Sequence, residues 1–194
     1  MPGDDLPVLG AGTAREWQGW LAEHHQASPG VWLKIAKKRP GADGGALSYA
    51  EALDCALCFG WIDGQKGGLD DQHWLQRFTP RKPRSKWSKI NREKADRLIA
   101  DGRMAPAGLR EVEAARADGR WDAAYEGQAA ATVPPDLARA LEANPAARAF
   151  FETLTGVNRY AILYRIADAK RPETRERRIA KFVRMLAERT TIYP

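Results

Sequence analysis

The sequence predicts an α+β fold that is mainly helical, with a small antiparallel sheet in the N-terminal part and an all-helical C-terminal part. Three strand-like runs, at residues 31–36, 60–66 and 73–79, all lie in the first half of the chain. After residue 135, every apolar pattern has helical periodicity. Strands grouped in one part of a chain and helices in another are typical of this fold class.

A segment over residues 126–135 interrupts these patterns, and it is rich in Gly, Ala, Thr and Pro. Such composition is typical of a linker. We therefore expect an α+β domain over residues 1–125 and a helical domain over residues 134–194 that packs against it.

Capping sequences indicate where the first helices begin. Thr13 and Glu16 have the spacing of a capping box, and Ser48 and Glu51 repeat it. In such a box the two side chains accept backbone N–H groups that the helix leaves unpaired. Residues 1–12 show no periodicity, and we expect them to form a loose tail.

The predicted sheet lies between these helices and the next pair. Apolar residues alternate over residues 31–36, which indicates a half-buried strand. The runs at 60–66 and 73–79 flank the turn-forming residues 67–71, and this arrangement predicts a hairpin. Residues 88–119 are expected to form two helices.

The C-terminal part carries several helix signals. Asn144 and Pro145 are favourable residues for the N-cap and for the first position of a helix. Residues 157–169 are apolar on most sides and predict a buried helix. Pro172 begins the last predicted helix, which carries one apolar stripe: Ile179, Phe182, Val183 and Leu186.

The net charge of +6 is concentrated in two segments. Residues 77–94 hold eight Lys/Arg against one acid, and residues 165–189 hold nine against four. This distribution indicates a local surface that attracts anions. No apolar run approaches the ~20 residues of a membrane span. Residues 1–5 are acidic, unlike a signal peptide. We expect a cytoplasmic protein.

Five motifs occur in order along the chain: LCFGWIDG at 57–64, RFTPR at 77–81, SKWSKIN at 85–91, GRM at 102–104 and ETRERRI at 173–179. Taken together, from about Trp17 to Leu186, the chain resembles the family named for YdeI or OmpD association, also described as bacteriocin-protection proteins. The resemblance implies a small helical C-terminal domain and a role in tolerance of antimicrobial peptides or envelope stress. It implies no catalytic residues.

Cys55 and Cys58 have the spacing of a redox pair, but they fall in the last turns of a predicted helix. The helix dipole disfavours a thiolate there, so we expect both to pack in the core. Asp71 and His73 form a weak metal candidate against the alternative of a solvated turn. We expect no metal and no cofactor.

The hairpin carries the most prominent candidate site. If it is centred on Asp70, Asp63 faces Arg77 and Trp61 faces Thr79 on one side of the sheet. The other candidate ligand-binding residues follow in sequence, and the last two lie near a helix N-terminus: Arg81, Lys86, Trp87, Ser88 and Asn91. The alternative is a structural ion pair, a buried Trp and a solvated basic loop.

The leading hypothesis from the sequence is a protein that binds an anionic, phosphate-bearing ligand at this face. Nucleic acid would bind there without sequence specificity, because the chain has no recognisable DNA- or RNA-binding motif. Two alternatives stay open. One is an enzyme that acts on a small anionic substrate, with Asp63 as general acid or base and Arg77 as charge stabiliser. The other is a scaffold that binds a protein partner through the C-terminal half. Arg175 is expected on the solvated side of the last helix.

Overall fold

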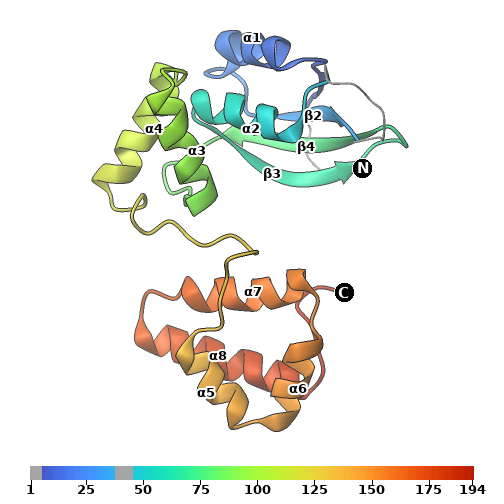
Figure 1. Cartoon of the computed structure of the whole chain (residues 1–194), viewed down its shortest axis with the longest axis vertical. Helices are drawn as coiled ribbons and strands as arrows, with labels where there is room; N and C mark the ends of the chain where they lie inside the picture. Colours follow the sequence, from blue (N-terminus) through green and yellow to red (C-terminus); the bar gives the residue numbers. More distant parts are fainter. Residues whose placement is uncertain (1–5, 38–45) are drawn as a thin grey trace. The chain divides into compact units, whose positions relative to one another are not determined.

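The structure is a computed structural model that describes residues 6–37 and 46–194. The chain divides into two compact units, the first ending at Ala124 and the second spanning Tyr125–Pro194 (Figure 1). The first unit contains the sheet and four helices among its described residues, and the second contains four helices.

The sheet of the first unit has four strands in the order β1-β2-β4-β3. They are β1 (Val8–Gly10), β2 (Val31–Ala36), β3 (Trp61–Gly68) and β4 (His73–Pro80). The antiparallel pairs β2–β4 and β4–β3 confirm the predicted small sheet. β1 runs parallel to β2, so the sheet is mixed and the predicted tail over residues 1–12 was wrong for this strand. Three residues are too few for periodicity to reveal a strand.

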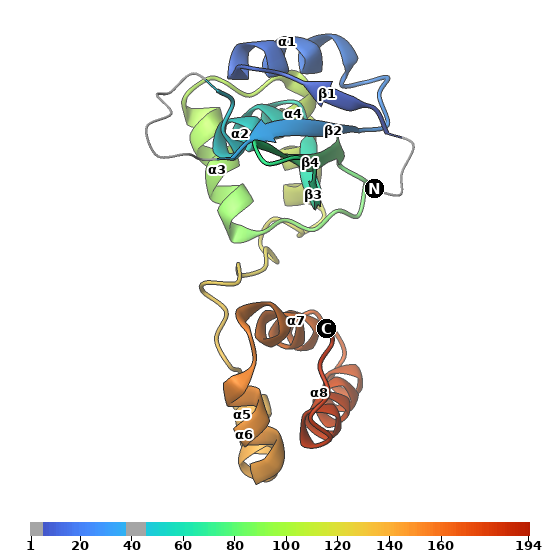
Figure 2. The same ribbon diagram turned by 90° about the vertical axis from the view of Figure 1, so that its right-hand side faces the viewer.

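Helices α1 (Ala14–His24) and α2 (Tyr49–Cys58) cover one face of the sheet (Figures 1 and 2). Both begin at the predicted caps, Thr13 and Ser48, and Ser48 forms the full capping box with Glu51. Trp17 lies at the centre of this core, where its Nε1 donates to the carbonyl of Ala52 at 3.0 Å. The sheet therefore packs on α1 and α2 through a core that contains a fully buried indole.

Helices α3 (Lys89–Ala100) and α4 (Pro106–Ala117) complete the first unit and confirm the pair predicted over residues 88–119. Gly108 allows α4 to approach the end of α2 closely. A Cβ atom at this position would lie 2.4 Å from the carbonyl oxygen of Cys58. Only glycine fits this contact without a backbone shift.

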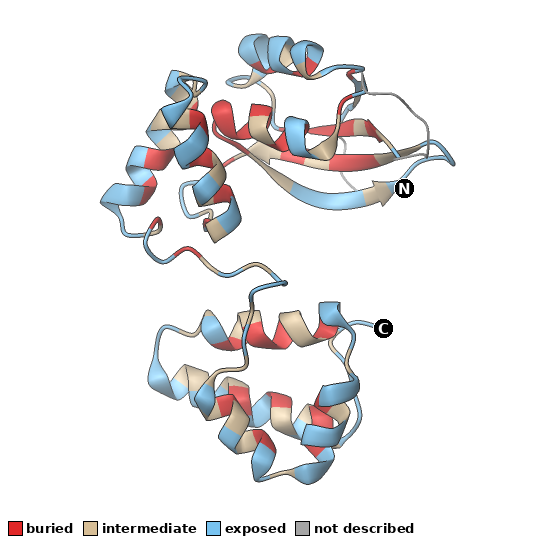
Figure 3. Ribbon diagram, in the orientation of Figure 1, coloured by how far each residue is buried: buried red, intermediate tan, exposed pale blue. Residues whose placement is uncertain are grey.

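The second unit consists of α5 (Pro135–Glu142), α6 (Pro145–Thr153), α7 (Gly156–Ala167) and α8 (Pro172–Ala187). Figure 3 shows that each helix turns a buried stripe inward and an exposed face outward. The predicted stripe on α8 is confirmed for Ile179, Phe182 and Leu186, whereas Val183 is half-buried. The second core thus forms from residues of the second unit alone.

Within the described ranges, no helix combines the length and the apolar character needed to cross a membrane.

Candidate functional site

The hairpin register differs from the prediction. Trp61 pairs with Pro80 and Asp63 with Phe78, and an irregularity follows between Asp63 and Lys66. Asp63 therefore shares a face with Phe78, and Arg77 lies on the opposite face of the sheet. The predicted Asp63–Arg77 pair was wrong by one residue, because a shift of one in register moves every side chain to the other face.

The turn explains the shift. Asp70 Oδ1 accepts the backbone N–H groups of Gln72 at 2.8 Å and His73 at 2.6 Å, and it also contacts His73 Nδ1 at 3.0 Å. These bonds fix a turn centred beyond Asp70. His73 thus contacts Asp70, whereas the weak metal candidate paired it with Asp71. Among the described residues, no group of three or more His, Cys, Asp or Glu is arranged to hold a metal ion.

Asp63 belongs to a small cluster on the helix-covered side of the sheet. Its Oδ2 accepts the hydroxyl of Tyr49 at 2.8 Å. Lys66 Nζ lies 4.8 Å from the ring centroid of Trp74 and 5.6 Å from that of Tyr49. Burial, together with the charge of Asp63 and its hydrogen bond, raises the pKa of Tyr49 far above its usual range, so this phenol stays a donor.

Both predicted ligand-stacking indoles are buried. Trp61 is 1% exposed, and its Nε1 donates to the carbonyl of His25 at 3.1 Å. Trp87 is also 1% exposed and packs against Trp121. Arg81, 6% exposed, places its Cζ 3.5 Å from the Trp87 ring centroid and donates to the carbonyl of Lys86. These three side chains build the core of the first unit instead of a stacking surface.

Of the remaining candidate residues, some have structural roles and others are partly or fully exposed. The Ser88 hydroxyl accepts the N–H of Asn91 at 3.2 Å and caps α3, and Asn91 itself is buried. Arg77 and Thr79 are half-buried, and Lys86 is exposed. The nine candidates are therefore not brought to one surface, and ligand binding by this set stays a prediction.

An ordered basic loop remains from the predicted site. The Ser85 hydroxyl accepts the N–H of Lys82 at 2.9 Å, and the Ser85 carbonyl accepts Arg120 Nη1 at 2.9 Å. This tight turn leaves Lys82 and Arg84 exposed. Together with the exposed Lys86, these two cations can reach an anion in solution.

A large groove lies in the second unit, between α5 and α8, and was missed by the sequence interpretation. This α5–α8 groove has a volume of about 1000 Å³. Apolar side chains line it: Ala140, Ala143, Ile179, Ala180, Val183 and Ala187. Four exposed charged residues also line it: Arg139, Glu176, Arg184 and Glu188. The sequence signal was the small residues Ala180 and Ala187 beside the apolar stripe of the last helix.

Arg175 closes one end of the groove and corrects a further expectation. It is 28% exposed at its side chain and pairs with Asp136 through two contacts, Nε–Oδ2 at 2.5 Å and Nη2–Oδ1 at 2.9 Å. Its Nη1 also donates to the carbonyl of Ile166. Arg175 therefore connects α5, α7 and α8, and its placement on a solvated helix face was wrong.

The two cysteines are free thiols, and their predicted place in the core is confirmed. Burial raises the pKa of Cys55 to about 11, with a smaller contribution from Cys58. Burial also raises the pKa of Cys58. Both thiols therefore stay protonated at neutral pH, which disfavours nucleophilic or redox chemistry.

Two known families match the chain, and the boundary between the two matches lies close to the boundary between the two units. Residues 9–111, more than half of the chain, match a family described as a domain of unknown function (DUF8412). Residues 130–189 match the family described as bacteriocin-protection, YdeI or OmpD-associated, which confirms the resemblance for the C-terminal part. No curated protein and no solved structure matches the chain. The chain belongs to the DUF8412 family through residues 9–111, and residues 130–189 of its second unit match the YdeI/OmpD-associated family.

Proposed function

We propose that the second unit is a protein-binding module in which the α5–α8 groove holds one amphipathic helix of a partner protein. The groove itself carries this proposal, because it combines an apolar floor with a charged rim. Amphipathic helices bind such grooves by placing apolar side chains on the floor. This is the scaffold alternative from the sequence, now assigned to particular residues.

The dimensions of the groove fit a helix. α8 has 16 residues and is about 24 Å long at 1.5 Å per residue. The floor residues Ala140, Ala143 and Ala180 have short side chains, so the backbone of a partner helix can approach closely. α5 has 8 residues and is about 12 Å long, so a partner helix of about two turns would cover the length that α5 and α8 share.

The rim charges specify the flanks of the partner helix. Arg139 and Arg184 are exposed cations, and Glu176 and Glu188 are exposed anions. Charges of both signs favour a partner whose apolar face is bordered by acidic and basic residues. Complementary rim charges mainly set orientation and specificity, whereas the buried floor supplies most of the affinity.

The family description supports a physiological role for such binding. The family that residues 130–189 match is described as bacteriocin-protection, YdeI or OmpD-associated. We propose that this chain acts in tolerance of antimicrobial peptides or envelope stress by holding a partner protein. The enzyme alternative required Asp63 and Arg77 on one face, and the sheet register places them on opposite faces.

A photo-cross-linking experiment tests this proposal. A photoreactive amino acid is placed at Ala180 on the groove floor and, as the matched control, at Ala149, an exposed helical alanine on α6 outside the groove lining. Cross-linked peptides from native cell extract are then sequenced by mass spectrometry. We expect the Ala180 position to capture one recurring amphipathic helical segment that the Ala149 position does not. Identical captures at both positions, or segments without helical amphipathicity, would reject the proposal.

Anion binding by the basic loop is a second candidate, supported by the exposure of Lys82 and Arg84 on a hydrogen-bonded turn. A charge-driven contact of this kind loses affinity as salt rises. Isothermal titration with pyrophosphate and with a short oligonucleotide should show binding that Lys82→Gln/Arg84→Gln weakens. The control, Arg177→Gln on α8, removes one exposed cation elsewhere and should leave binding unchanged. Equal affinities in the wild type and the loop variant would exclude this site.

A further inference from the structure

A second cavity of the C-terminal unit lies along α7 and has a volume of about 300 Å³. Three tyrosines line it, Tyr160, Tyr164 and Tyr193, together with Val157, Arg165 and Gln128. We refer to it as the tyrosine cavity. None of its lining residues lines the α5–α8 groove, so an inference from it is independent of the proposed function.

A buried amide fixes one wall of the tyrosine cavity. Asn158 is 7% exposed, and its Oδ1 accepts the N–H groups of Ile192 at 3.1 Å and Tyr193 at 2.9 Å. Its Nδ2 donates to the carbonyl of Tyr193 at 3.1 Å. These bonds hold the backbone at Tyr193 firmly, yet the Tyr193 side chain stays 44% exposed. The fold thus fixes the backbone that carries this exposed ring.

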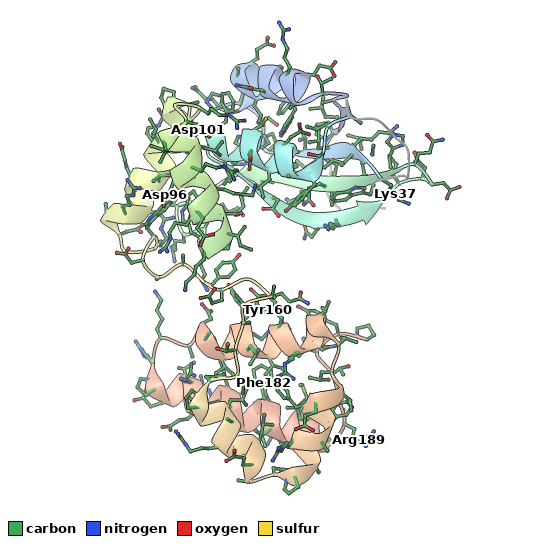
Figure 4. The ribbon with its side chains drawn as sticks, viewed as in Figure 1. Lys37, Asp96, Asp101, Tyr160, Phe182 and Arg189 are labelled. Carbon is green, nitrogen blue, oxygen red and sulfur yellow. The ribbon has the colours of Figure 1, made fainter. Side chains whose placement is uncertain are left out.

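The opposite wall is also held by hydrogen bonds and ring contacts. The Tyr160 hydroxyl donates to the carbonyl of Glu126 at 2.9 Å, and the rings of Tyr160 and Tyr164 have centroids 5.9 Å apart. Figure 4 shows Tyr160 on the outer side of α7, away from Phe182 in the helical core. Gly156 leaves room for Gln128, since a Cβ there would lie 2.5 Å from Gln128 Nε2.

The charge inside the tyrosine cavity has one sign. Arg165 donates through Nη1 to the carbonyl of Ala161 at 3.1 Å and through Nη2 to the Tyr193 hydroxyl at 3.4 Å, and its Cζ lies 5.7 Å from the Tyr193 ring centroid. A guanidinium has five N–H donors, so these two bonds leave others for a ligand. Among the described residues that line the cavity, none is acidic. A cationic ligand would meet repulsion here, and an anionic group would meet a charge-assisted donor.

We propose that the tyrosine cavity binds a small planar aromatic ring that carries an anionic group. The ring stacks against the exposed side chain of Tyr193, as bases stack on exposed aromatic residues in other binding sites. The anionic group accepts N–H groups of Arg165, whose planar fork matches a carboxylate or a phosphate. The volume, at the lower limit of ordinary ligand cavities, suits a mononucleotide or an aromatic carboxylate.

Isothermal titration of the full chain with two matched probe pairs tests the proposal. It also distinguishes a mononucleotide from an aromatic carboxylate as the ligand. The pairs are adenosine 5′-monophosphate with adenosine, and 4-hydroxybenzoate with phenol. We expect the charged member of at least one pair to bind about tenfold tighter than its neutral partner, and the preferred pair identifies the source. Failure of every probe to bind with a Kd below about 5 mM would overturn the proposal, as would equal affinities within both pairs.

Variants locate the binding. Tyr193→Ala should weaken the charged probe at least about tenfold, whereas Tyr193→Phe keeps the ring and should stay within about threefold. Arg165→Met should abolish the preference for the charged probe, and Arg165→Lys should restore part of it. Thermal unfolding of each variant checks that the unit still folds. Ala149→Arg, at an exposed alanine of α6 that lines neither the groove nor the tyrosine cavity, should have no effect on these affinities. Binding unchanged by Tyr193→Ala and Arg165→Met would place the ligand elsewhere and reject the site.

Discussion

Asp136 and Arg175 form a two-contact ion pair that joins the first turn of α5 to the first turn of α8. The pair lies at one end of the α5–α8 groove and fixes the position of one of its walls relative to the other. Arg175 also donates to the carbonyl of Ile166 at 3.0 Å, which adds α7 to the same junction. This arginine therefore contributes to the geometry of the proposed binding groove.

Replacement of this arginine should destabilise the protein. Arg175→Ala removes two charge-assisted hydrogen bonds and leaves the Ile166 carbonyl without this donor, so we expect a loss of about 1–2 kcal/mol, reduced for partial solvent exposure. The control Arg177→Ala, at an exposed position two residues away, should cost less than about 0.5 kcal/mol. Urea unfolding of the three proteins measures the difference. Equal losses for the two variants would contradict the structural role of Arg175.

The same pair predicts a dependence of stability on pH. The Arg175 hydrogen bond holds the pKa of Asp136 below its ordinary value, so the folded state binds this proton less readily than the unfolded state. The stabilisation is therefore present above the ordinary Asp pKa of about 4 and is lost as pH falls through the folded value. Arg175→Met should show a shallower loss of unfolding free energy between pH 5 and about 3. Parallel pH profiles for wild type and variant would refute this linkage.

The cysteines predict a second, opposite pH dependence. The pKa of Cys55 is raised to about 11, so the folded state keeps its thiol proton where the unfolded state, with an ordinary pKa near 9, has lost it. The unfolding free energy should therefore decrease as pH rises from about 9 to 11.

At pH 8 both thiols should react slowly with a disulfide reagent until urea unfolds the chain. Rapid reaction of the native protein would contradict their burial.

Replacing both cysteines with alanine should cost about 1–3 kcal/mol of unfolding free energy, because the variant loses buried volume without losing a functional group. Binding at the groove and at the tyrosine cavity should stay unchanged. A stoichiometric metal in the purified protein, detected by elemental analysis, or loss of binding in the variant would overturn the structural interpretation of this pair.

Gly108 offers a matched pair of glycine substitutions. Gly108→Ala places a methyl group within 2.4 Å of a backbone oxygen of Cys58, so we expect a loss of about 1–3 kcal/mol or more. Gly19→Ala, within α1, meets nothing within 4 Å and should be neutral or stabilising by up to about 1 kcal/mol. Thermal or urea unfolding measures the stability change of each variant. A neutral Gly108→Ala would mean that α4 does not pack on α2 as closely as described.

The sequence predicted most elements because capping boxes and periodicity are local signals. Thr13 and Ser48 begin helices as expected, and the helix predicted over residues 157–169 is observed as α7, Gly156–Ala167, in the second core. The hairpin register was not predictable in this way. It depends on the turn that Asp70 forms with Gln72 and His73. A register shift of one residue places Asp63 and Arg77 on opposite faces of the sheet.

Local sequence patterns also did not predict which charged and aromatic side chains are buried. Trp87 and Arg81 occur within a basic run, and charge runs usually indicate solvated surface. In the folded unit Arg81 stacks on Trp87, and both are buried. Arg175 shows the same effect in the second unit, since its partner Asp136 lies 39 residues away in sequence. The groove went unpredicted because it arises only when α5 and α8 pack side by side.

The most direct test of the central claim is the affinity of the second unit's groove for the helical segment that cross-linking identifies. Isothermal titration compares a synthetic peptide of that segment with the wild type, with Ala180→Arg on the groove floor, and with Ala149→Arg as a matched exposed alanine on α6. We predict that Ala180→Arg weakens binding at least about tenfold and that Ala149→Arg leaves it within about twofold. Equal affinities for all three proteins would contradict the assignment of the α5–α8 groove as the partner-binding site.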